Sequence, residues 1–299
     1  MKAARLQAYG DVDQFRLEDV PEPAVGPGEV VIAVAASGLN PVDLYVRQGY
    51  MKDFVPLSLP GITGVDAAGT IVSVGPGVSG FAVGDRVVGH LPINGKGAHA
   101  ERAIVPVAGL AKLAANLSFE QGATLPLVGL TARNAVDALG VKAGHRVLVS
   151  GALGSVGRAA VQYLKELGAV PVAGVRGSRL AEGRALAGEA VDIEAAPAAS
   201  FDFAVSTAAP VAANTLRFVA DGGKVASVVQ TPADANPDNR VSVAQTMGSD
   251  DPVKLQQIAD AAARGDLHLP VAKTFALAEL PEAHRALAAG AAGKIVIVH

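Results

Sequence analysis

The chain of 299 residues contains no cysteine. This absence excludes disulfides, thiolate nucleophiles and cysteine-ligated zinc or iron–sulfur sites. The sequence also lacks a run of basic residues, and its 28 acidic and 25 basic side chains give a net charge of −3. Because an acidic excess repels nucleic acid, we expect no DNA or RNA partner.

A long apolar run is also missing. The longest uncharged stretch, residues 67–84, is interrupted by five glycines and a proline, which argues against a membrane helix. Residues 1–15 lack the continuous apolar core of a signal peptide. We therefore expect a soluble, cytoplasmic protein without a membrane partner. The length of the chain suggests roughly two domains.

Two patterns divide the chain. The first third reads as short strands separated by glycine and proline turns, at 28–38, 69–75, 84–90 and 99–106. Ser118 then precedes a helical pattern that continues to Gly140. Beyond it, predicted strands alternate with predicted helices, the strands being 145–150, 169–175, 201–207 and 223–229. This alternation is typical of a parallel sheet covered by helices.

Three more elements are predicted near the end of the chain. Residues 253–264 and 279–289 have helical patterns, and residues 294–298 read as a short strand. We expect this last strand to return to the first domain.

A glycine-spaced turn, residues 151–157, follows the strand at 145–150 and opens a helix. In register with the dinucleotide fingerprint G-x-G-x-x-G, Ala152 replaces the first glycine. Gly154 would let the backbone approach a pyrophosphate, and Gly157 would let the helix pack tightly on the sheet. With the helix N-terminus at Ser155 and Val156, the turn is a predicted phosphate site, the alternative being a structural turn.

The second strand of this alternation ends without the acidic residue that NAD sites usually carry there. Instead Arg176, Ser178 and Arg179 follow it. These side chains suit a ribose 2′-phosphate through charge-assisted hydrogen bonds, which favours NADPH. The alternative is that they are ordinary solvated residues at a helix start.

Five segments in chain order resemble the zinc-free quinone oxidoreductase, or zeta-crystallin-like, branch of the medium-chain dehydrogenase/reductase family: residues 38–49, 59–89, 129–136, 150–157 and 283–297. The resemblance implies an α/β fold in which a GroES-like β-rich catalytic domain (1–120 plus 268–299) receives an inserted Rossmann NADP-binding domain (121–267). It also implies an active site in the cleft between them and a homodimer formed through Rossmann sheet edges, with which strand 224–229 is compatible.

The resemblance bears on metal as well. Zinc-dependent relatives place a cysteine where this chain has Asn40 and a histidine where it has Val65. The six histidines show no ligand spacing. No metal is therefore expected, and reduction of an electrophilic quinone or enone is favoured over alcohol oxidation.

By resemblance, Asn40 and Tyr45 face the nicotinamide, where each can donate a hydrogen bond to the acceptor oxygen. Tyr50 is a second candidate, and Asp43 is either an orienting residue or a simple cap. The remaining expected cofactor contacts are Thr131, Ser206, Thr207, Val229, Gln230, Gly293 and Lys294. For Thr131 the alternative is a helix-interior threonine, and for Lys294 a solvated lysine.

The sequence thus predicts an NADPH-dependent reductase of a small quinone or enone. A 2-alkenal or enoyl-thioester reductase is the alternative within enzymes. A non-catalytic NADPH-binding structural protein is the alternative of another class.

Overall fold

The computed structural model describes residues 1–195 and 197–299. Its internal contacts form two compact units. Unit 1 comprises residues 1–127, 250–265 and 269–299, and unit 2 comprises residues 128–249 and 266–268. The predicted boundaries differ most at α7 (Pro252–Arg264): we placed it in the Rossmann domain, but it packs on β8 (Leu110–Lys112) in unit 1.

Unit 1 is built on antiparallel strands. Within the described residues its larger sheet has the order β15-β16-β3-β5-β6-β8, with β7 also paired to β3. These strands are β3 (Glu29–Leu39), β5 (Asp66–Val74), β6 (Arg86–His90), β7 (Arg102–Pro106), β15 (Val271–Ala276) and β16 (Lys294–Val298). The four strands predicted in the first third are confirmed as β3, β5, β6 and β7.

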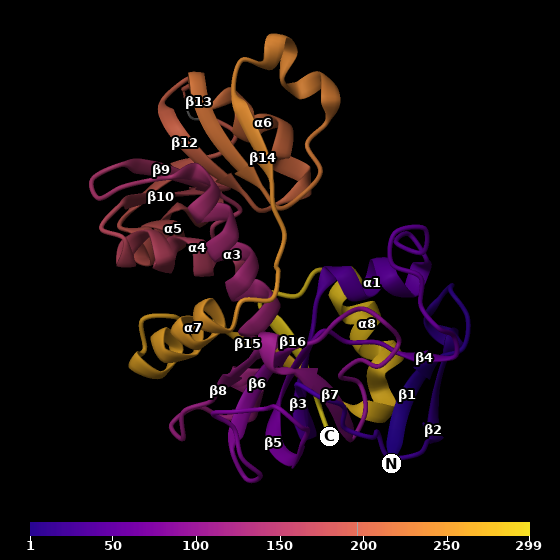
Figure 1. Ribbon diagram of the computed structural model, residues 1–299. Coiled ribbons are helices and arrows are strands. Elements are labelled where there is room, and N and C mark those ends of the chain that lie inside the picture. The colour runs from indigo at the N-terminus through magenta and orange to yellow at the C-terminus, as the bar shows by residue number, and fades with distance from the viewer. Residues whose placement is uncertain (196) are drawn as a thin grey trace. The chain divides into compact units, whose positions relative to one another are not determined.

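The end of the chain completes this sheet. β16 pairs antiparallel with β3, so that Ile295 lies opposite Leu39, and parallel with β15. Figure 1 shows these late strands beside the early β3. The expected return of residues 294–298 to the first domain is therefore confirmed.

A second, smaller sheet in unit 1 joins β1 (Lys2–Leu6) to β2 (Phe15–Asp19) and β4 (Gly61–Ile62). Its inner face shares a core with β16 and with α8 (Leu280–Ala288). Leu6, Leu39 and Ile295 are fully buried there. This core fixes the position of α1 (Pro41–Gln48), because α1 packs on α8.

Unit 2 is a parallel sheet with strand order β11-β10-β9-β12-β13-β14 in the described part of the chain. The strands are β9 (Arg146–Ser150), β10 (Val170–Val175), β11 (Glu189–Asp192), β12 (Phe201–Ser206), β13 (Val219–Ser227) and β14 (Ser242–Gln245). The Rossmann-type parallel sheet that the alternating pattern predicted is confirmed.

Three helices of unit 2 follow its first, second and fourth strands. They are α4 (Ser155–Glu166), α5 (Leu180–Ala187) and α6 (Ala212–Arg217). α4 and α5 pack on β9, β10 and β11, whereas α6 packs on β12 and β13. The residues facing the strands are small or apolar, as Ala160, Leu164 and Leu216 are.

The helical pattern from Ser118 to Gly140 is two helices rather than one. α2 (Phe119–Gly122) starts at Ser118, whose hydroxyl accepts the Gln121 N–H, and α3 (Pro126–Leu139) follows. Pro126 has no N–H to continue the first helix, but its fixed φ suits the first position of the second.

The strand that we considered for dimer contacts lies inside the sheet. β13 pairs with β12 on one side and with β14 on the other, so residues 224–227 cannot accept another copy's strand. The edge of this half of the sheet is β14. In the described part of the chain, no helix has the length and apolarity needed to cross a bilayer.

Two leucines on neighbouring strands test this packing. Leu6 on β1 is fully buried, whereas Leu17 on β2 is 47% exposed. Leu6→Ala should lower the free energy of unfolding by about 2–5 kcal/mol, and Leu17→Ala by less than about 0.5 kcal/mol. Urea unfolding followed by far-UV circular dichroism measures both, and equal losses would contradict the described core.

Candidate functional site

The glycine turn after β9 is held by backbone geometry and by one hydroxyl. Gly151 has φ +77°, and a Cβ there would lie 2.6 Å from the Thr207 hydroxyl oxygen. Only glycine combines this conformation with such a close approach. The Thr207 hydroxyl donates to the Ser150 carbonyl at 2.8 Å, which ties the end of β12 to the turn.

The turn leaves the N-terminus of α4 open. Gly154 is the N-cap and carries no side chain that could accept from the first turn. The N–H groups of Ser155 and Val156 have no acceptor within the helix, because the first N–H groups of any α-helix lack one. A Cβ at the exposed Gly154 would come no nearer than 3.3 Å to Gly151 O.

Gly157 closes the same turn from the helix side. A Cβ on Gly157 would lie 2.3 Å from Gly151 O and 2.7 Å from Ala152 Cα. The helix therefore packs on the turn backbone only with glycine at this position. Together, the uncapped N–H groups and the bare backbone fit the pyrophosphate of a dinucleotide.

The loop after β10 carries the residues predicted for a 2′-phosphate. Arg176, Ser178 and Arg179 are all exposed. The guanidinium of Arg179 donates to both carboxylate oxygens of Glu182, at 2.8 and 2.6 Å. Arg176 has no carboxylate partner in the described chain, so it is the cation of this loop that is available for a ligand phosphate.

The residues at the ends of β12 and β13 differ in how far their side chains are exposed to solvent. Ser206 is fully buried and its hydroxyl donates to the Thr215 hydroxyl at 3.5 Å, so its side chain is closed to solvent, and its expected contact with a ligand stays a prediction. The Val229 carbonyl accepts from Ser227 and Gln245, whereas Gln230 is exposed. All four strand-end residues remain predicted cofactor contacts, and all but Ser206 are at least partly exposed. Thr131 is buried in α3 and stays a prediction as well.

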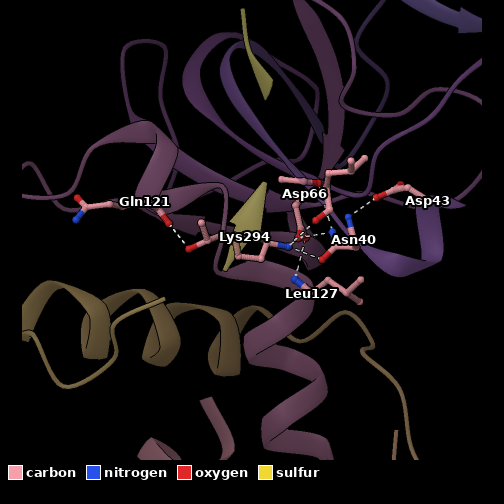
Figure 2. A network of polar contacts seen from close by, with 9 residues as sticks. Asn40, Asp43, Asp66, Gln121, Leu127 and Lys294 are labelled. Carbon is pink, nitrogen blue, oxygen red and sulfur yellow. Dashed lines mark hydrogen bonds and ion pairs between the residues drawn. The ribbon is translucent and has the colours of Figure 1, made fainter. Parts of the chain in front are cut away.

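A buried polar network lies in unit 1 (Figure 2). The Lys294 ammonium donates to Asn40 Oδ1 at 2.5 Å and to the Leu39 carbonyl at 3.0 Å, and lies 3.8 Å from an Asp66 oxygen. The other Asp66 oxygen accepts the Leu127 N–H, in the first turn of α3. Lys294 is 4% exposed and Asp66 is fully buried.

This network changes the interpretation of two predicted residues. Lys294 is not a solvated lysine, because its ammonium is buried and bonded inside unit 1, and its expected cofactor contact stays a prediction. The Asn40 amide nitrogen donates to Asp66 at 2.8 Å and to the Gly38 carbonyl at 3.3 Å. Its amide protons are therefore already bonded. At Gly293, which has φ +149°, a Cβ would lie 2.6 Å from the Pro270 carbonyl oxygen; the expected cofactor contact of Gly293 stays a prediction.

Asp43 joins this network at the start of α1. Its carboxylate accepts the Asn40 N–H at 2.8 Å. Burial raises the pKa of Asp43 to about 7 against the lowering effect of the Asn40 N–H, and the charge of Asp66 adds to the rise. Burial also lowers the pKa of Lys294, although Asp66 and Asp43 oppose that shift.

Next to this network lies a small pocket of unit 1. The Thr63 hydroxyl oxygen is buried there without a hydrogen-bond partner in the described chain. With the Asp43 carboxyl it gives an apolar pocket two groups that can bond water or a small polar ligand. The wall includes Asp43, Val46, Leu57, Thr63, Pro92 and Ile93.

The tyrosines of α1 are accessible. Tyr45 is 49% exposed, and Tyr50, just beyond the helix, is 71% exposed. Their ring centroids lie 6.3 Å apart. Both hydroxyls can therefore reach a ligand at this end of unit 1, and their catalytic role stays a prediction.

Three residues of these sites were missed. Gly151 and Asp66 lie in two of the segments that carry the family resemblance. The positive φ of Gly151 and the buried ion pair of Asp66 depend on residues far away in the chain, so the neighbouring sequence does not indicate them. The third is Asp192, at the end of β11. We predicted no strand at 189–192, so nothing in the sequence placed this acid beside the loop after β10.

Comparisons with known proteins agree with both units. A family model described as alcohol dehydrogenase GroES-like domain matches residues 26–115, and one described as zinc-binding dehydrogenase matches residues 181–297. The quinone oxidoreductase of Lama guanicoe is 30% identical over 327 aligned positions, covering 100% of this chain and 97% of the relative.

Other matches are partial or structural. The 2-methylene-furan-3-one reductase of Solanum lycopersicum is 36% identical over 56% of this chain and 45% of its own length. For several curated relatives the match spans about half of their length or less. A solved NAD-dependent alcohol dehydrogenase is 30% identical with a TM-score of 0.86, covering 100% of both chains.

The second family model names zinc, but the donor set of this chain does not fit a zinc centre. In residues 1–195 and 197–299, no three His, Asp or Glu side chains gather in a way that could hold a metal ion. At the two positions compared with zinc ligands stand the Asn40 amide, whose oxygen binds Lys294, and the apolar Val65.

Asp43→Asn should change how stability depends on pH. The raised pKa means that Asp43 stabilises the fold fully below its ordinary value of 3.8 and loses this contribution as the pH rises through about 7. As the pH rises from 3.8 to about 7, the free energy of unfolding of the wild type should fall relative to that of the variant. Urea titrations from pH 4.5 to 8 measure the difference, and parallel curves would contradict a raised pKa.

Lys294→Met should leave the carboxylate of Asp66 buried without its cation. We expect a loss of about 3–5 kcal/mol in the free energy of unfolding, and a smaller loss in the double variant with Asp66→Asn. Lys52→Met, at an exposed turn residue, is the matched control. Chemical denaturation compares the four proteins. If Lys294→Met behaves like the control, the ion pair does not stabilise the fold.

Proposed function

Because the chain belongs to the quinone oxidoreductase branch of the medium-chain dehydrogenase/reductase family, we propose that it is an NADPH-dependent reductase. In this proposal it transfers hydride to a quinone or a similar electrophilic enone, without a metal. The observation that carries it is the glycine turn of unit 2, which opens an uncapped helix at the carboxyl ends of parallel strands.

A bound nicotinamide nucleotide supplies the hydride in this reaction. The N–H groups of Ser155 and Val156 hold its pyrophosphate, and Gly154 keeps the approach free of side-chain atoms. Arg176 binds the 2′-phosphate with a charge-assisted hydrogen bond, helped by Ser178. These roles use groups that have no partner among the described residues of unit 2.

Residues of unit 1 act on the acceptor. The hydroxyls of Tyr45 and Tyr50 donate hydrogen bonds to the acceptor oxygen and stabilise the negative charge that develops there. Asn40 has a positioning role, because its amide is fixed by Asp66 and Lys294 at the start of the helix that carries Tyr45. The anionic product then takes a proton from water or from a nearby hydroxyl.

An enone substrate is the second candidate, favoured by the similarity to 2-methylene-furan-3-one reductase. Enals and enoyl-thioesters belong to the same chemical class, since hydride adds to an activated double bond in each. A protein that binds NADPH without catalysis would bind the nucleotide equally well but would turn over none of these acceptors.

Arg176→Ala tests the proposal. The variant should lose about tenfold in kcat/KM for NADPH, because one charge-assisted hydrogen bond is removed, and little for NADH. Arg146→Ala is the matched control, because Arg146 starts β9 and so lies at the amino ends of the parallel strands, away from the carboxyl ends that Arg176 follows. Nucleotide oxidation is followed by absorbance with a small quinone, an enal and an enoyl-CoA.

Two results would count against the proposal. Turnover of none of the acceptors by the wild type would favour the non-catalytic alternative. An unchanged NADPH to NADH ratio in Arg176→Ala would remove the phosphate assignment.

A further inference from the structure

A carboxylate stands beside the loop that follows β10. In the sheet, Asp192, the last residue of β11, pairs with Val175, the last residue of β10. A Cβ on Gly177 would lie 2.6 Å from Asp192 Oδ2. The other oxygen, Oδ1, accepts the Glu194 N–H at 3.0 Å, which fixes the orientation of the carboxylate. Asp192 therefore presents one oxygen to the loop of Arg176 and Ser178.

This acid alters the charge of the loop. Arg179 is paired with Glu182 by two hydrogen bonds, so its charge is largely balanced. Asp192 adds a second negative charge beside Gly177, in the loop that carries the remaining cation, Arg176. The charges of Arg176, Arg179, Glu182 and Asp192 sum to zero, whereas the loop alone carries two positive charges.

We propose that Asp192 is a specificity-determining residue for the nucleotide. Its carboxylate accepts a hydrogen bond from the ribose hydroxyl of NADH and repels the 2′-phosphate of NADPH. The acid that an NAD site normally carries at the end of its second strand is supplied here by the neighbouring strand. The site consequently binds both nucleotides and prefers NADPH only modestly, a conclusion that rests on the proposed nucleotide site of unit 2.

The size of the effect follows from partly screened charges. Two unit charges about 4 Å apart interact by about 1 kcal/mol when they are fully exposed to water, which is roughly a fivefold change in affinity. Salt weakens such an interaction, because the Debye length is about 8 Å at physiological ionic strength.

Asp192→Asn in the full chain tests the inference. Asparagine keeps the Oδ1 acceptor for the Glu194 N–H and removes the charge. Binding of 2′,5′-ADP and of 5′-AMP is measured by calorimetry, which needs no acceptor and no turnover. The ratio of the two affinities should shift toward 2′,5′-ADP by about fivefold at low salt, and by less in higher salt.

Glu182→Gln is a second variant, because it releases Arg179 for the phosphate and should shift the ratio in the same direction. Asp202→Asn is the matched control: Asp202 is an exposed acid near the start of β12, at the amino ends of the parallel strands, whereas Asp192 lies at a carboxyl end. Circular dichroism confirms that each variant folds.

The outcomes separate this inference from the proposed function. A shift in Asp192→Asn but not in Asp202→Asn supports it. If Arg176→Ala lowers affinity for 2′,5′-ADP and Asp192→Asn leaves the ratio unchanged, the inference is wrong and the phosphate site stands. If neither variant changes the ratio, or if neither probe binds the wild type, both fail.

Discussion

The ion pair of Lys294 and Asp66 is the interaction on which unit 1 depends. Both side chains are buried. An unpaired charge in the protein interior costs several kcal/mol. The pair is satisfied only when β16, β5, the residue before α1 and the first turn of α3 meet at one point. A small displacement of any of these segments leaves a buried charge or amide unpaired. The start of α1, and with it the helix that carries Tyr45, is thereby fixed.

Much of the fold could be predicted because its signals are local. Glycine and proline turns delimit β3, β5, β6 and β7, and alternating strand and helix patterns indicate a parallel sheet. The glycine turn of unit 2 could also be predicted, since a strand, spaced glycines and a helix stand next to one another in the chain. At this turn the sequence and the structure agree on which groups are left open, namely backbone N–H groups rather than side chains.

The rest depends on contacts between residues far apart in sequence. Nothing near Lys294 indicates that it binds Asn40, and an exposed lysine is the ordinary expectation. Ser206 follows the rule for strand ends, yet its side chain faces the interior. Helix α7 has the expected pattern but packs on β8, because amphipathic spacing defines a helix and not its partner. The position of Asp192 beside the loop after β10 could be recognised only from the pairing of β11 with β10.

The closure of the large sheet by β16 has a consequence for biosynthesis. Unit 2 is almost a single segment of the chain, residues 128–249. This segment leaves the ribosome before β15 and β16 are made. During translation the Rossmann sheet can fold with its own strands, while β3 exposes the edge that β16 will cover. In the interval the nascent GroES-like unit has an unpaired hydrophobic strand, which is the kind of surface that chaperones bind. The synthesis of β16 thus decides when this edge of β3 is covered.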